Sequence, residues 1–167
     1  MRVLSFDIST AVVGYSLFDD GILIRYGFID LSRIESQFLF SKIDAFFDVF
    51  DFPDDVTQVR IEESLKRLAY GSSTIDTIII LSKFNSALSF ALYKKYNIYP
   101  KFLNCMSVRK EIGIMIPKKA ENKKEIILNF IDSKFNLYLL TNKKGNIDSR
   151  NFDVADAIVL GVKQNTV

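Results

Sequence analysis

Residues 3–31 read VLSFDISTAVVGYSLFDDGILIRYGFIDL, and this stretch predicts three β-strands joined by tight turns. An apolar run at residues 3–6 ends at Asp7, a second run covers residues 14–18, and a third covers residues 22–31. Short apolar runs bounded by turn residues are typical of buried strands. Between the second and third runs, Asp19-Asp20-Gly21 is typical of a hairpin turn, because Asp-Gly tolerates positive φ angles. We therefore expect an antiparallel three-stranded unit.

The rest of the chain predicts strands that alternate with helices. Residues 36–50 have apolar side chains at helical spacing, and Pro53 then stops that helix. The pattern predicts strands at residues 56–62 and 98–103, a helical turn at 107–112, and helices at 74–96, 121–138 and 152–162. This order favours an α/β fold, a five-stranded mixed sheet with helices packed on both faces. The length of 167 residues fits a single domain, 1–167.

Composition excludes several classes of site. The chain has no histidine and only one cysteine, Cys105, which excludes Ser-His-Asp and Cys-His catalysis, nearly every zinc site and an internal disulfide. A bound metal would therefore have oxygen ligands, as Mg²⁺ and Mn²⁺ prefer. Asp7 interrupts the apolar stretch that a signal peptide needs, and no apolar run approaches the roughly 18 residues of a membrane span. We expect a cytoplasmic protein with no membrane partner.

The net charge of +2 conceals an asymmetry along the chain. Residues 1–64 carry 5 Lys/Arg and 12 Asp/Glu, a balance of −7, whereas residues 65–167 carry 17 Lys/Arg and 8 Asp/Glu, a balance of +9. A basic half can attract an acidic polymer such as a nucleic acid. A solvated lysine-rich surface would give the same count.

Four acids occupy apolar segments. Asp7 and Glu62 each end an apolar strand, and Asp153 and Asp156 lie in FDVADAIVLGV, where their i, i+3 spacing places both on one helix face. Adjacent buried carboxylates are costly unless a cation balances them. Individually, Asp7 could be a turn residue or helix cap, Glu62 a surface acid beside Glu63, and Asp153 a first-turn acid that favours the helix dipole. Together the four predict a metal site.

Three segments resemble one known family. DISTAVVGYSLF at residues 7–18, VRIEES at 59–64 and FDVADAIVLG at 152–161 resemble the conserved blocks of RuvC-type Holliday junction resolvases. The order and spacing of the blocks fit essentially the whole chain, and its phenylalanine- and lysine-rich character looks more like phage or viral members. The resemblance implies an RNase H-like fold and, for a viral protein, a location in the host-cell cytoplasm.

The resemblance also implies a chemistry. Asp7, Glu62, Asp153 and Asp156 would bind two Mg²⁺ ions per active site, for which Mn²⁺ may substitute, with Glu63 as an alternative to Glu62 and Asp148 as an alternative to Asp153. Two such metals activate water and relieve charge on the leaving oxygen of a phosphodiester. Asp7, on a rigid strand, would bridge both ions. The products would carry 5′-phosphate and 3′-hydroxyl ends. The basic residues expected to position the phosphate are Lys110 and Lys118 or Lys119.

The expected partner is branched DNA, in particular a four-way junction. Lys66, Arg67 and Tyr70 follow Glu62 in a predicted loop, and with Lys118 and Lys119 they are the expected DNA contacts. Tyr70 could stack on an unpaired base, or it could simply be a partly buried loop tyrosine.

The resemblance further implies a homodimer. The helix at residues 74–96 is apolar on more than one stripe, which would suit a dimer interface or a fully buried helix in a monomer.

Alternative functions use the same residues. An RNase H-like nuclease acting on RNA–DNA hybrids or flaps would need the same four acids, and a non-catalytic branched-DNA-binding module could keep the same fold. A sugar-kinase or actin-type ATPase also begins with an acid on a strand followed by small residues. That class normally needs two lobes and a second phosphate loop, which a chain of this length does not provide.

Overall fold

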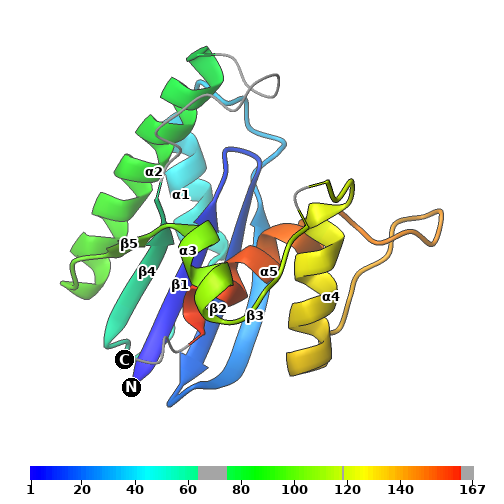
Figure 1. Ribbon diagram of the computed structural model, residues 1–167. Helices are drawn as coiled ribbons and strands as arrows, with labels where there is room; N and C mark the ends of the chain where they lie inside the picture. Colours follow the sequence, from blue (N-terminus) through cyan, green and yellow to red (C-terminus); the bar gives the residue numbers. More distant parts are fainter. Residues whose placement is uncertain (64–74, 118, 163–167) are drawn as a thin grey trace.

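The computed structural model describes residues 1–63, 75–117 and 119–162, and the predicted α/β architecture is confirmed (Figure 1). The ends of the elements differ from the predicted ones by a few residues. For example, the helix expected at residues 36–50 is Leu39–Val49, and the one expected at 121–138 is Lys123–Phe135. The elements in chain order are β1 (Arg2–Ile8), β2 (Val12–Asp19), β3 (Ile22–Asp30), α1 (Leu39–Val49), β4 (Gln58–Glu62), α2 (Ile75–Tyr96), β5 (Lys101–Leu103), α3 (Cys105–Glu111), α4 (Lys123–Phe135) and α5 (Arg150–Gly161).

The sheet has five strands in the order β3-β2-β1-β4-β5, so β1 lies at its centre. β1 and β3 are antiparallel to β2, whereas β4 runs parallel to β1 and β5 parallel to β4. Asp20 and Gly21 have φ angles of 45° and 84°, as expected for the predicted hairpin turn. The antiparallel unit therefore forms one side of the sheet, and the strands that follow helices form the other.

Helices cover both faces of the sheet, and alternation along the strands decides which side chains face which layer. Leu4, Phe6 and Ile8 of β1 belong to the core beneath α1 and α2, whereas Val3 belongs to the core formed with α3, α4 and α5. Side chains two residues apart in a strand share a face. Asp7 therefore lies on the same face as Val3, on the side that α5 covers.

α5 packs directly on the central strands. The Ala157 carbonyl accepts hydrogen bonds from the hydroxyls of Ser5, at 2.8 Å, and Ser16, at 3.0 Å. Gly14 makes this approach possible, because a Cβ there would lie 2.2 Å from the backbone oxygen of Asp153. The far end of α5 is held by Arg60 of β4, whose Nη1 donates to three carbonyls at the end of the helix. The position of α5 over the sheet is thus set at both ends.

α2 is unusual for its exposed apolar surface. Phe84, Leu88 and Leu92 are buried in the core, but Ile75 is 65% and Phe90 63% exposed. The most apolar window of this 22-residue helix has a mean hydropathy of 1.4 and is 28% buried. By length and composition alone α2 could cross a membrane, so the expectation that no segment is long enough is not supported. A single such helix is weak evidence for a membrane.

Candidate metal centre

Asp7 and Glu62 lie side by side at the same end of two parallel strands. β1 and β4 are paired in register through Phe6 and Ile61, the residues that immediately precede the two acids. On β4, Arg60 reaches α5, and Glu62 is two residues further along, so Glu62 shares that face. The carboxyl groups of Asp7 and Glu62 are joined by a hydrogen bond that raises the pKa of Asp7 and lowers that of Glu62. Two carboxyl groups can be hydrogen-bonded only through a proton between them, so these two side chains lie next to each other.

α5 brings the other two acids to the same place. Asp153 and Asp156 are on adjacent turns of α5, and both raise the pKa of Asp7 by charge repulsion. Burial is the largest cause of the raised pKa in all four acids, and it lifts the pKa of Asp153 to about 6. Each of the four residues is nevertheless only partly buried as a whole. The four acids therefore form one electrostatically coupled cluster that an ion could reach.

Two cations from neighbouring helices partly balance this cluster. Arg109 of α3 donates from Nη2 to Asp156 at 2.6 Å, with the two side chains 17% and 14% exposed, and it lowers the pKa of Asp156. Lys124 of α4 lowers the pKa of Asp153, Glu62 and Asp156. If all four carboxylates were ionised, these two positive charges would leave a local balance of −2. A divalent cation would correct that imbalance.

The donor set suits a hard divalent metal, but it is not a closed cage. All four side chains offer oxygen, as Mg²⁺ prefers, and the chain has no histidine to favour zinc. Within the described residues, no three acidic or cysteine side chains are already arranged as a metal site. Asp156 in particular is engaged by Arg109. The chemistry of the residues fits Mg²⁺ or Mn²⁺, and the carboxylates would have to draw together to hold it.

The two alternative acids have other surroundings. Asp148 accepts hydrogen bonds from the Arg150 guanidinium at 2.7 and 2.9 Å, and this pairing lowers its pKa to about 2. The backbone N–H of Glu63 donates to Leu103 across the strand pair. The structure thus groups Asp153 and Glu62 with Asp7 and pairs Asp148 with Arg150. The alternative role of Glu63 stays a prediction.

The basic residues expected from the sequence are not those that the structure brings to the acids. Lys110 and Lys119 are exposed and form no ion pair with a described residue, so their roles stay predictions. The remaining expected contacts lie outside the described residues: Lys66, Arg67, Tyr70 and Lys118.

Sequence reasoning missed Arg109 and Lys124. Helical spacing could have indicated Arg109, because it lies four residues after Cys105, which is buried, and next to Val108, which is also buried. Lys110 lies on the outer side of the helix. No comparable pattern marked Lys124, whose position depends on how α4 packs beside α5.

Comparison with known proteins shows the fold. The sequence matches no protein-family model and no curated protein. T. thermophilus RuvC in complex with a Holliday junction substrate is similar in structure, with a TM-score of 0.59 and 12% identity over 96% of this chain and 89% of that one. The yeast mitochondrial Holliday junction resolvase Ydc2 has a TM-score of 0.53 and 16% identity over 95% of this chain and 75% of that one. The chain therefore has the RNase H-like fold of RuvC-type resolvases, as the sequence blocks implied.

Proposed function

We propose that this protein is a metal-dependent endonuclease that resolves Holliday junctions and other branched DNA by phosphodiester hydrolysis. The observation that carries the proposal is the convergence of Asp7, Glu62, Asp153 and Asp156 from β1, β4 and α5 into one coupled cluster. The fold supports it, because RuvC and Ydc2, with which the chain shares that fold, are described as bound to a Holliday junction and as a Holliday junction resolvase.

The four carboxylates would hold two Mg²⁺ ions, or Mn²⁺ in their place. When bound, such ions activate a water molecule and stabilise charge on the leaving oxygen. Asp7 is the central ligand of the proposal, since it ends the central strand β1 and the charges of the other three acids all raise its pKa. Ion binding would favour the ionised forms of these carboxyl groups, whose pKa values are raised by burial.

The cations near the acids would bind the DNA backbone. The charges of Arg109 and Lys124 both lower the pKa of Glu62, so the two cations lie close to the cluster. The Nε of Arg109 is buried and has no hydrogen-bond partner in the described part of the chain. Beside Arg109, a groove of about 740 Å³ also has Lys110 and Lys123 in its wall. Arginine and lysine at such positions suit phosphate oxygens, so this groove is the proposed path of the strand that leads to the cut.

We further propose that two copies act together through the exposed face of α2. Resolution requires two strands to be cut, and a two-fold dimer presents two equivalent sites. Phe90 on α2 is 63% exposed, and replacing it with Glu should convert a dimer into a monomer in sedimentation at micromolar concentration. Ile22→Glu on edge strand β3, where Ile22 is 69% exposed, is the matched control and should leave the dimer intact. A wild-type mass equal to one chain would contradict this part of the proposal.

The decisive experiment is cleavage of a labelled four-way junction with Mg²⁺, with EDTA as the control. Paired nicks should appear with Mg²⁺ alone, and Asp7→Asn should abolish them while junction binding survives. An RNA–DNA hybrid and a flap in parallel reactions separate the related nuclease activities, because preferential cutting of either would reassign the substrate. Metal-independent cutting, or Asp7→Asn cutting at a near-normal rate, would refute the site. Junction binding without cutting would identify a non-catalytic module.

A further inference from the structure

A hairpin with a basic tip projects from the body between α4 and α5 (Figure 1, the orange loop after α4). Thr141 and Ile147 form a β-bridge, and the backbone N–H of Asn142 donates to Asn146 at 2.8 Å. Gly145 turns the chain with a φ of 79°. All residues from 141 to 147 are exposed, so packing against the core does not hold this shape.

The side chain of Asn142 organises the tip from within. Its Oδ1 accepts hydrogen bonds from the backbone N–H groups of Lys144, at 2.9 Å, and Asn146, at 3.1 Å. Such a side-chain-to-backbone turn supplies the order that an exposed loop usually lacks. The structure therefore shows a defined hairpin here.

The base of the hairpin is clamped to the helix that carries Asp153 and Asp156. Asn151, in the first turn of α5, is only 5% exposed. Its Nδ2 donates to the carbonyls of Leu140 and Asp148, each at 2.8 Å, and its Oδ1 accepts from the Leu140 N–H at 3.1 Å. One side chain therefore holds both arms of the hairpin, two residues away from Asp153.

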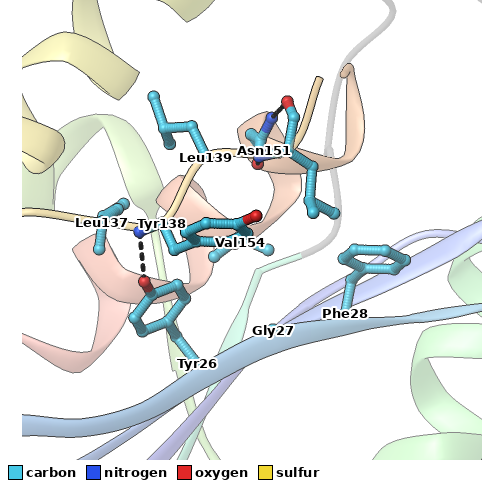
Figure 2. Close-up of a pocket in the computed structure, with 9 residues that line it drawn as sticks. Tyr26, Gly27, Phe28, Leu137, Tyr138, Leu139, Asn151 and Val154 are labelled. Atoms are coloured by element: carbon cyan, nitrogen blue, oxygen red, sulfur yellow. Dashed lines mark hydrogen bonds between the residues drawn. The ribbon is translucent and has the colours of Figure 1, made fainter. Parts of the chain in front are cut away.

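A second set of contacts fixes the same base to edge strand β3. Figure 2 shows the hydroxyl of Tyr26 accepting the backbone N–H of Tyr138, at 2.6 Å, beside the Asn151 clamp. Arg150 bonds Asp148 and also reaches Asp30, at 3.4 Å. The hairpin is thus tied to two elements of the folded body and keeps a set position relative to the acid cluster.

The tip presents two adjacent cations. Lys143 and Lys144 are exposed, no acid occurs between residues 141 and 147, and neither lysine forms an ion pair with a described residue. Apolar tip residues, which would suit a membrane surface or a protein groove, are absent between residues 142 and 146. An ordered hairpin holds these two ammonium groups at a fixed spacing, which suits binding to the regularly spaced phosphates of duplex DNA.

We propose that the 141–147 hairpin is a DNA-backbone-binding finger that grips the junction arm beside the cut. The inference rests on the proposed function, since it assumes that branched DNA lies on the acid cluster. The four residues from Asp148 to Lys144 extend about 13 Å at the rise of a β-strand. The tip therefore stands away from α5 and contacts phosphates of the arm outside the acid cluster, not the scissile phosphate itself.

The test compares two double variants in junction binding with EDTA present, so that no cleavage intervenes. Lys143→Gln/Lys144→Gln should weaken affinity roughly tenfold or more at 0.1 M salt and should reduce the slope of log affinity against log salt by about 1.8, because each phosphate contact contributes about 0.9. Cleavage at saturating junction should stay within about threefold of wild type. Lys101→Gln/Lys134→Gln, on two exposed lysines of β5 and of the last turn of α4, is the matched control and should change neither quantity.

A position-specific readout completes the test. Neutral methylphosphonates are placed one at a time along the arm beside the cut; at one or two positions away from the scissile phosphate they should weaken wild-type binding but should have little further effect on the finger variant. Equal affinity and salt slope for wild type and the finger variant would overturn the finger while leaving the nuclease proposal in place. Failure of wild type to bind a junction at all would overturn the proposed function instead. We expect the double variants to have the melting temperature of wild type, because the substituted side chains are exposed. Equal melting temperatures would show that the variants are folded.

Discussion

Replacing Asp153 with Asn should stabilise the metal-free protein at neutral pH. The pKa of Asp153 is raised from 3.8 to about 6, and burial is the largest cause. Lys124 lowers the pKa, whereas repulsion from Asp156 and Glu62 raises it further. When folding raises the pKa of a carboxyl group, ionising that group costs more in the native state than in the unfolded state, so ionisation lowers the free energy of unfolding. Wild-type stability should therefore fall as the pH rises from about 4 to about 6 and then level off. Asn carries no such charge.

The size of the effect follows from that pKa. A rise from 3.8 to about 6 corresponds to about 3 kcal/mol if solvent screening is ignored. Because Asp153 keeps some solvent access, we discount this to about 1.5 kcal/mol. Asp153 also lies in the first turn of α5, where a negative charge is favourable by about 0.5 kcal/mol. The net gain is about 1 kcal/mol, or roughly 2–4 °C in Tm.

Thermal melts in EDTA at pH 7.5 and pH 4 would measure this gain. Asp153→Asn should melt higher at pH 7.5 and lose most of that advantage at pH 4, where the wild-type carboxyl is protonated. Asp76→Asn is the matched control, because Asp76 is an exposed acid in the first turn of α2, and it should melt slightly lower than wild type. Mg²⁺ at tenfold its Kd should stabilise wild type by about 1.4 kcal/mol, and Asp153→Asn should lose most of that increment. A lower Tm for Asp153→Asn at pH 7.5, or an equal gain at both pH values, would refute the reasoning.

Three further predictions concern the surroundings of the acids. Gly14→Ala should destabilise the protein by about 3 kcal/mol and reduce cleavage more than tenfold, because its Cβ would collide with the backbone oxygen of Asp153; urea unfolding and a cleavage assay below Tm test both effects. Arg60→Met should lower the free energy of unfolding by about 2–3 kcal/mol, since it removes the donor to the end of α5, yet cleavage at 20 °C should be nearly normal. Arg109→Ala removes the cation that lowers the pKa of Asp156, so the acidic limb of the pH–rate profile should move to higher pH, whereas Arg109→Lys should restore most of it.

The acid cluster was predictable because each acid interrupts a strong local pattern. Asp7 and Glu62 follow apolar strand residues, and Asp153 and Asp156 share a helix face, so alternation and helical spacing already indicate where they point. The cation that pairs with Asp156 was not predicted: Lys110 was expected to position the phosphate, whereas the contact with Asp156 is made by the neighbouring Arg109. One residue along a helix turns a side chain by about 100°, and only the packing of α3 against α5 shows which cation faces inward.

By itself the sequence determined the antiparallel unit, the order of strands and helices, the oxygen-only donor set and the separation of charge along the chain. These follow from local periodicity, turn chemistry and composition, which need no knowledge of distant contacts. Tertiary structure alone decided how deeply the four acids are removed from water, which cations balance them, and that residues 141–147 form a clamped hairpin. Desolvation and charge pairing depend on segments far apart in the chain, such as Gly14 meeting Asp153, and no local pattern encodes that approach.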